Sequence, residues 1–233
     1  MSERNALNRR FLPHGLVILY EDRDLLVVDK PAGLLTMATD SEKMRTAYYS
    51  LTDYVRKGYR KSRKRIFIVH RLDRETSGIV IFAKNIESKT YLQGHWNETT
   101  KEYLAVVHGQ CTETSGTITT YLAENKAHGV YSTSDTRRGR LSITGYRVLR
   151  QTRIFALMEL DLITGRKHQI RVHLAGIGHA VVGDQKYGKK DRGHSRLALH
   201  ASAISFRHPF LGQQLAFESP APAYFYQLVG RIS

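Results

Sequence analysis

Residues 66–84 read IFIVHRLDRETSGIVIFAK, in which a polar segment separates two strongly apolar runs. The β-branched and aromatic residues of both runs predict two buried strands joined by a polar loop, and loops at strand ends often hold functional side chains. Asp73 lies in this loop close to Arg71 and Arg74, whose positive charges would keep it ionised and fix its orientation. A plain turn is the alternative, because aspartate accepts local backbone hydrogen bonds and Gly78 supplies a permissive backbone conformation.

Strand patterns dominate the rest of the chain, which has the composition of a folded globular protein, with 41% hydrophobic and 24% charged residues. Strands are expected over residues 16–20, 25–31, 66–70, 78–83, 103–109, 117–123, 143–149, 155–163 and 197–206, and helices over 51–58, 86–96, 168–176 and 222–230. Because the strands outnumber the helices and do not alternate strictly with them, we expect an α+β fold with a mixed, largely antiparallel central sheet and peripheral helices. No linker or repeat divides the chain, so we expect a loose N-terminal segment over residues 1–15 and a single domain over 16–233.

The chain is strongly basic, with 36 Lys and Arg against 21 Asp and Glu and a formal net charge of +15 over 233 residues. This surplus favours nucleic acid as a partner, because cations displace the counterions condensed on phosphates. A membrane surface is the alternative, but the densest basic run, residues 56–65, lacks the apolar stripe of a membrane-binding helix. Without an apolar spanning segment or a secretory signal, the sequence predicts a cytoplasmic protein. Its single cysteine, Cys111, excludes an internal disulfide and a thiolate-rich zinc site.

A second cluster of cationic and titratable residues surrounds the start of the helix expected over 168–176. Its members are Arg166, Lys167, His168, Arg171 and His173. Zinc binding is disfavoured because His168 and His173, five residues apart, would lie on different faces of the helix and no thiolate is available as a further ligand. We therefore expect no metal. A solvated basic face does not explain the interleaved apolar residues, and an arginine in a partly buried setting needs a partner such as the carboxylate of Asp73.

Several segments resemble the motifs of the RluA family of pseudouridine synthases, and they occur in the family's order over most of the chain. The matching segments are residues 30–33 (KPAG), 70–78 (HRLDRETSG), 101–109 (KEYLAVVHG), 164–174 (TGRKHQIRVHL), 183–188 (GDQKYG) and 196–209 (RLALHASAISFRHP). HRLDxxTSG together with GRxHQIRxH is highly specific, whereas KPAG alone would be weak. The resemblance implies the pseudouridine synthase catalytic fold and isomerisation of a uridine in folded RNA. The N1 glycosidic bond breaks, the uracil turns in place, and C5 joins C1′, with no cofactor or metal.

The resemblance also implies a role for each site residue. Asp73 is the nucleophile, attacking either C1′ of the ribose or C6 of the uracil. Tyr103 stacks on the uracil, and Leu199 forms an apolar wall of the pocket. Arg171 is the expected guanidinium partner of Asp73, with Arg166 the second candidate. The target nucleotide is expected to flip out of its helix while Arg71 enters the RNA stack in its place. Basic residues in 56–65, 137–140 and 186–196 would bind the RNA backbone.

Structured ribosomal or transfer RNA is therefore the expected partner, and neither a membrane nor a protein partner is expected, so the protein should be monomeric. Only about 15 residues precede the first expected strand, too few for the S4-like domain of many family members, so we expect a catalytic domain alone. Two alternatives stay open. A non-catalytic RNA-binding or ribosome-assembly factor would share the charge but not the chemistry, and a metal-dependent nuclease would cleave the strand.

Overall fold

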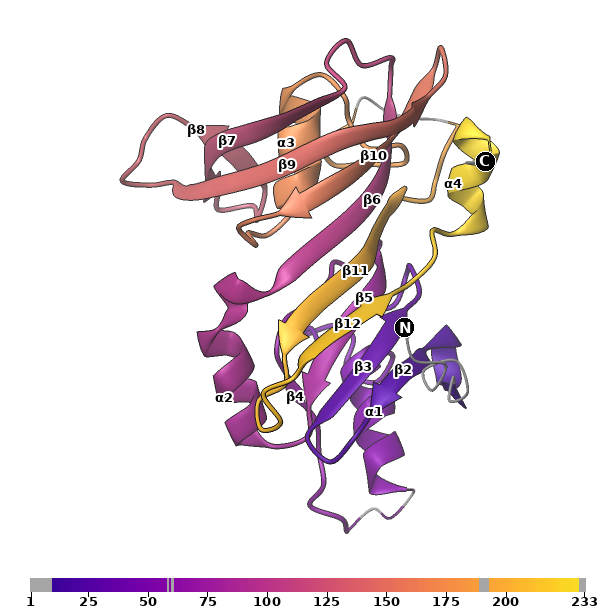
Figure 1. Cartoon of the computed structure of the whole chain (residues 1–233), viewed down its shortest axis with the longest axis vertical. Coiled ribbons are helices and arrows are strands. Elements are labelled where there is room, and N and C mark those ends of the chain that lie inside the picture. The colour runs from indigo at the N-terminus through magenta and orange to yellow at the C-terminus, as the bar shows by residue number, and fades with distance from the viewer. Residues whose placement is uncertain (1–9, 58, 60, 189–192, 231–233) are drawn as a thin grey trace. The chain divides into compact units, whose positions relative to one another are not determined.

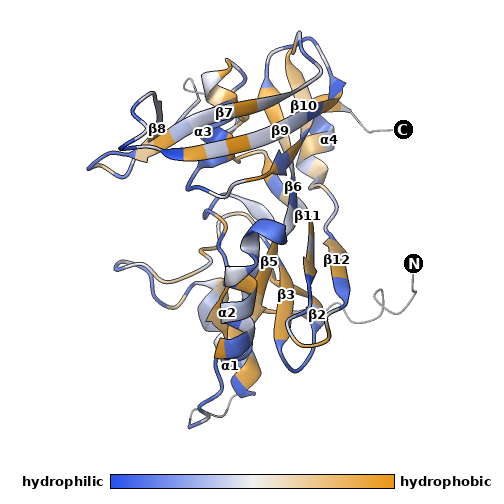
Figure 2. Ribbon diagram, turned by 60° about the vertical axis from the view of Figure 1, so that its left-hand side comes forward, coloured by the Kyte–Doolittle hydropathy of each residue, from blue (hydrophilic) through white to orange (hydrophobic). Residues whose placement is uncertain are grey.

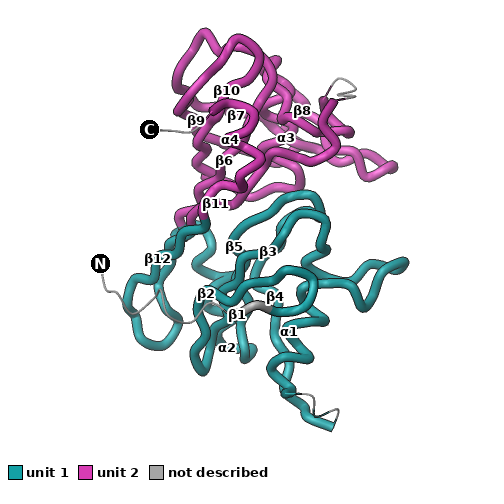
Figure 3. Tube along the Cα trace, turned by 90° about the vertical axis from the view of Figure 1, so that its right-hand side faces the viewer, with its two compact units in different colours: residues 1–99, 204–219 teal, residues 100–203, 220–233 magenta. Residues whose placement is uncertain are grey.

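The computed structural model describes residues 10–57, 59, 61–188 and 193–230. The chain forms two compact units, shown in two colours in Figure 3. Unit 1 is Met1–Thr99 with Ile204–Ser219, and unit 2 is Thr100–Ala203 with Pro220–Ser233. One strand, β11 (Leu199–Arg207), begins in unit 2 and ends in unit 1. In the described part of the chain, no helix is long and apolar enough to cross a membrane.

Unit 1 contains a sheet with the strand order β1-β2-β3-β5-β11. Its strands are β1 (Arg10–Phe11), β2 (Val17–Glu21), β3 (Leu25–Lys30) and β5 (Ser77–Ala83), with β4 (Phe67–Ile68) beside β5 and β12 (Gln214–Glu218) beside β11. The pairs β1–β2, β2–β3, β3–β5 and β4–β5 are antiparallel. Almost every residue of β3 and β5 is buried, as their continuous apolar runs require, and Figure 2 shows both strands as largely hydrophobic.

Two helices of unit 1 begin at side-chain caps, and two short 3-10 turns, η2 (Pro13–Gly15) and η3 (Trp96–Glu98), accompany them. The Thr46 hydroxyl accepts the Tyr49 N–H and starts α1 (Ala47–Arg56). Asn85 accepts the Ser88 N–H in the same way and starts α2 (Ile86–Gly94). Helix α2 contributes Leu92 to an apolar core that it shares with side chains of β3, β5 and β12.

Unit 2 continues from β11 with the strand order β11-β6-β10-β9-β7-β8 (Figure 1). Its further strands are β6 (Thr100–His108), β7 (Ser115–Glu124), β8 (Val130–Thr133), β9 (Arg140–Gln151) and β10 (Phe155–Leu162), and its helices are α3 (Gln169–Gly176) and α4 (Ala223–Val229). The pairs β6–β10, β9–β10, β7–β9 and β7–β8 are antiparallel. The core of this unit joins apolar side chains of β6, β10, α3 and α4. Helix α3 is buried from Gln169 to Leu174, whereas α4 buries only Phe225 and Val229.

The predicted α+β fold with a mixed, largely antiparallel sheet is confirmed. The short strands β1, β8 and β12 were not predicted from the sequence. Helix α1 begins at Ala47, four residues before the predicted start at residue 51, because the Thr46 side chain caps it. That helix ends at Arg56 and is closed by Lys57 in the left-handed conformation, whereas Gly58, the residue expected to end it, lies outside the described residues. Of the N-terminal segment expected to be loose, residues 1–9 lie outside the described residues, and Arg10 and Phe11 pair with β2.

Candidate active site

Asp73 lies in the loop between β4 and β5, and the residues on both sides of it are hydrogen-bonded to the segment that follows β3. The buried hydroxyl of Thr36 accepts the N–H of Leu72 (3.2 Å) and donates to the carbonyl of the same residue (2.9 Å). The N–H of Gly33 donates to the carbonyl of Arg74 (2.7 Å). The backbone immediately before and after Asp73 is therefore fixed by residues more than 30 positions away in the sequence.

Lys30 is a fully buried cation at the end of β3. Its ammonium donates to the carbonyls of Leu34 (2.8 Å), Pro31 (3.0 Å) and Arg74 (3.4 Å), so all three of its donors have an acceptor. The β3–β5 register places Lys30 opposite Gly78, which follows the polar loop and has a φ of 112°. Lys30 therefore contacts the loop through its hydrogen bond to Arg74 and lies beside the residue at which the chain re-enters the sheet.

Two opposing effects act on the pKa of Lys30. Burial lowers the pKa of Lys30 to about 8, while the carboxylates of Asp73, Glu75 and Asp29 act in the opposite direction by favouring the ammonium form. A buried ammonium attracts a nearby carboxylate strongly because little water screens the interaction. Lys30 thus gives the loop of Asp73 a positive charge in addition to those of Arg71 and Arg74.

The two residues at the start of the HRLD segment have different roles. His70 accepts the N–H of Ile81 through Nε2 (3.0 Å), and its ring packs on Trp96 with 4.5 Å between ring centroids. This hydrogen bond assigns the ring proton to Nδ1 and makes His70 part of the support of β5. Arg71 is exposed, and its guanidinium lies 3.9 Å from the sulfur of Met37.

In unit 2, Arg171 of α3 forms a buried, bidentate ion pair with Asp184. Nε donates to Oδ2 (2.7 Å) and Nη2 donates to Oδ1 (2.8 Å). Burial alone would raise the pKa of Asp184, but the hydrogen bonds and charge of Arg171 lower it, so the carboxylate is ionised. The guanidinium also lies over the ring of Tyr187, 5.2 Å from its centroid. The orientation of Arg171 is therefore fixed by contacts within its own unit.

The remaining predicted site residues also belong to unit 2. Tyr103 lies on β6 opposite Leu160 and packs against the core that contains Leu199, the first residue of β11. Arg166 is exposed ahead of α3, and its N–H donates to the Gln169 side chain (3.0 Å). Asp73 and Arg71 lie together in one loop of unit 1. The pairing of Asp73 with Arg171 or Arg166 stays a prediction.

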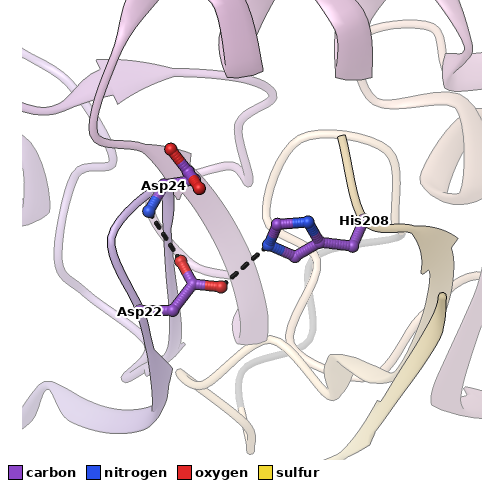
Figure 4. Close-up of side chains that lie close together, drawn as sticks. All are labelled: Asp22, Asp24 and His208. Carbon is purple, nitrogen blue, oxygen red and sulfur yellow. Dashed lines mark hydrogen bonds and ion pairs between the residues drawn. The ribbon is translucent and has the colours of Figure 1, made fainter. Parts of the chain in front are cut away.

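Among the described residues, Asp22, Asp24 and His208 form a group whose ligand atoms lie within 4.8 Å of one another, close enough to share a cation (Figure 4). Hydrogen bonds occupy these atoms. His208 donates from Nε2 to Asp22 (2.8 Å) and accepts at Nδ1 the N–H groups of Phe210 (3.2 Å) and Leu211 (3.0 Å). Asp22 also accepts the N–H of Asp24 (2.7 Å). The group joins the β2–β3 turn to the turn before β12 and does not have the character of an open metal site.

Comparison with known proteins identifies the family. Residues 24–176 match the family model described as RNA pseudouridylate synthase. The chain is 36% identical over 240 residues to an uncharacterized RNA pseudouridine synthase, YlyB, of Bacillus subtilis (strain 168), a match that covers 97% of this chain and 76% of that protein. This chain belongs to the RNA pseudouridine synthase family. As its RluA-type motifs predicted, the synthase is an isomerase that converts uridine in RNA to pseudouridine.

The synthase is also similar to a further bacterial protein and to a human protein. It is 35% identical over 218 residues to the ribosomal large subunit pseudouridine synthase D of Nitrosomonas europaea, a match that covers 89% of this chain and 62% of that protein. The solved structure of human RNA pseudouridylate synthase domain containing 4 aligns with a TM-score of 0.72 over 89% of each chain at 24% identity, which supports the fold. The expected pseudouridine synthase fold is therefore confirmed.

Sequence reasoning found the loop of the synthase but not its supports. Thr36 carried no signal in the sequence. Lys30 lies in the weak KPAG match, and Asp184 lies in GDQKYG, which resembled a family stretch without indicating a role. Together these residues fix the backbone around a carboxylate and orient a guanidinium. A fixed carboxylate can act as a nucleophile, and no electron transfer or external energy source is needed for an isomerisation of this kind.

Proposed function

We propose that this synthase modifies uridines in structured ribosomal or transfer RNA, with Asp73 as its nucleophile. An oxygen of the Asp73 carboxylate forms a transient bond to C1′, displacing the uracil, or adds to C6 of the ring. In either route the N1–C1′ bond breaks and the uracil turns. C5 then bonds to C1′, the bond to the aspartate oxygen breaks, C5 releases its proton and N1 takes one up, so the RNA gains and loses no other atom. The ribosomal target is supported by the name of the Nitrosomonas europaea relative.

The observation that carries this proposal is the fixed backbone around Asp73. Thr36 holds Leu72 on one side, and Gly33 and Lys30 hold Arg74 on the other. A nucleophile held at the reacting distance loses little entropy on reaching the transition state, which can lower the barrier by several kcal/mol. This support distinguishes the loop from a surface turn, in which an exposed aspartate would need no buried lysine beside it.

The other residues take the roles that the family motifs predict. Tyr103 stacks on the flipped uracil, Arg171 pairs with Asp73, Leu199 forms an apolar wall, and Arg71 fills the space that the flipped nucleotide leaves in the RNA stack. Flipping costs a few kcal/mol of stacking and pairing, so a residue that replaces the base lowers this cost. The exposure of Arg71 is compatible with such a role.

We further propose that units 1 and 2 form one catalytic domain. The family match, residues 24–176, includes parts of both units. The monomeric state and the cytoplasmic location stay predictions. So does RNA-backbone binding by residues 56–65 and 186–196, in which residues 58, 60 and 189–192 lie outside the described residues.

Mapping pseudouridines across all cellular RNA, with and without the gene, tests the proposed target. We expect a small set of ribosomal or transfer RNA sites to disappear in its absence and to return with the wild-type gene but not with Asp73→Asn. A set of lost sites confined to messenger RNA would contradict the proposed substrate while leaving the isomerase activity intact.

A further inference from the structure

A basic groove in unit 2 is lined by four cations, Arg138, Arg140, Arg166 and Lys167. Arg140 begins β9, and Arg138 lies in the turn before that strand. Arg166 and Lys167 lie in the segment before α3. The lining also includes the buried side chains of Leu122 and Val130.

Two of these cations are neutralised by carboxylates. Lys167 pairs with Glu124, and hydrogen bonds from Lys167 and His128 lower the pKa of Glu124 to about 2, so its carboxylate is ionised at neutral pH. Arg138 pairs with Asp135 at 3.4 Å. These pairs leave the groove with positive charge that comes from its other two arginines.

Arg140 and Arg166 are exposed. Within the residues that the structure describes, neither guanidinium has a carboxylate within the 4.0 Å range of an ion pair. A guanidinium presents donors in a planar fork that matches a phosphate, and it keeps its charge at any pH that the protein tolerates. Two such groups in one groove supply the positive charge and the hydrogen-bond donors that a polyanion requires.

The groove is pre-formed, because contacts tie the β7–β8 turn to the segments around α3. Lys186 donates to the carbonyl of His128 (3.0 Å). The hydroxyl of Tyr187 accepts the N–H of Val130 (3.1 Å) and lies 2.6 Å from Nδ1 of His168. Pre-formed sites bind more tightly because less conformational entropy is lost on binding.

We propose that Arg140 and Arg166 bind backbone phosphates of the RNA substrate in this groove. The inference deepens the proposed function and gives Arg166 a different role from the second candidate for pairing with Asp73. RNA is favoured over an acidic protein because the synthase family acts on RNA. The groove contributes affinity for RNA of any sequence, since phosphates carry no sequence information.

The test compares Arg140→Gln/Arg166→Gln with the control Arg153→Gln/Arg207→Gln, which removes two exposed arginines that lie outside the groove and, among the described residues, also have no carboxylate partner. Binding of a fluorescein-labelled RNA hairpin is measured by anisotropy over a range of salt concentrations. Each lost phosphate contact should weaken binding about eightfold at ~0.1 M salt and reduce the slope of log affinity against log salt by about 0.9. The groove variant should therefore bind roughly 60-fold more weakly, and the control should bind like the wild type.

Turnover separates binding from chemistry. With ribosomal RNA transcribed from C5-tritiated uridine, we expect the groove variant to show a raised KM and an unchanged kcat. Equal RNA affinity and equal salt slope in the groove variant and the control would overturn the proposal. The proposal would also be overturned if the groove variant lost its affinity for an acidic protein and still bound RNA like the wild type. A lowered kcat with unchanged KM would return Arg166 to the chemical step. If the wild type released no tritium, the proposed function would fail, while the anisotropy comparison would still decide the groove.

Discussion

Thr36 makes two hydrogen bonds to the backbone of Leu72, next to Asp73. Valine has nearly the same shape but no hydroxyl, so Thr36→Val leaves a buried N–H and a buried carbonyl without this partner. We expect a loss of about 1–3 kcal/mol in the free energy of unfolding. Because Asp73, the proposed nucleophile, would move, kcat should fall by about 10- to 100-fold with little change in RNA affinity. Urea unfolding and tritium release measure the two effects.

Thr52→Val is the matched control. Among the described residues, the hydroxyl of Thr52 is buried without a hydrogen-bond partner, so its removal should be neutral or stabilising and should leave kcat unchanged. Equal losses of activity in Thr36→Val and Thr52→Val would show that the contact with Leu72 has no special role.

The free energy of unfolding should depend on pH through His173, a buried residue of α3. Its ring is buried between the hydroxyls of Thr144 (2.9 Å) and Thr120 (3.1 Å), and burial lowers the pKa of His173 to about 4. Between pH 6.5 and 4 the unfolded chain binds a proton at this histidine that the folded chain does not. The contribution of His173 is therefore complete above pH 6.5 and declines by about 2–3 kcal/mol as the pH falls toward 4.

His173→Gln tests this prediction, because glutamine can bond to hydroxyl groups but does not titrate. We expect its free energy of unfolding to fall less steeply with decreasing pH than that of the wild type between pH 6.5 and 4. The two slopes should differ by up to about 1.4 kcal/mol per pH unit, the value for one bound proton. Parallel curves for the two proteins in urea titrations would contradict a neutral, buried His173.

At the scale of elements, the ion pair between Arg171 and Asp184 joins α3 to the segment that follows it. Asp184→Asn removes one charge from a pair whose side chains are 7% and 0% exposed, and we expect it to lower the free energy of unfolding by about 3–5 kcal/mol. Glu159→Gln, which breaks the exposed pair with Arg147, is the control and should cost less than about 1 kcal/mol. Similar losses in the two variants would mean that burial does not distinguish these pairs.

The elements that the sequence predicts well are those whose burial is visible in a continuous run. β5 reads SGIVIFA and is buried at every position, so its continuous apolar run predicts a buried strand. β12 reads QLAFE and has one buried residue, Phe217, which gives too weak a pattern to separate a strand from a loop. The start of α1 depends on the cap at Thr46, whose effect shows only when the backbone there is known to be extended.

The candidate site also has one part that could be predicted from the sequence and one part that could not. The loop of Asp73 was predictable because its charged residues interrupt two apolar strands. Its supports were not, because they depend on partners distant in sequence. Lys30 bonds to a carbonyl 44 residues away, and Thr36 bonds to a backbone 36 residues away. A lysine at the end of a strand is usually exposed, so no local pattern indicates that this one is buried.

At the scale of the whole molecule, we expect turnover without a bound divalent cation. The one carboxylate and histidine group of suitable size among the described residues already uses its ligand atoms in hydrogen bonds. We expect unchanged initial rates of tritium release in excess EDTA, with structure probing to verify that the RNA stays folded. Activity that disappeared with EDTA and returned with Mg²⁺, while the RNA fold did not change, would contradict this.

We propose that one aspartate, Asp73, carries the chemistry of this strongly basic synthase. The most direct measurement is release of tritium from ribosomal RNA transcribed with C5-tritiated uridine, by the wild type and by Asp73→Asn at equal RNA occupancy. We predict release by the wild type and none by Asp73→Asn, with RNA affinity within about twofold of the wild type because a carboxylate contributes nothing favourable to phosphate binding. Sustained release by Asp73→Asn would contradict the account.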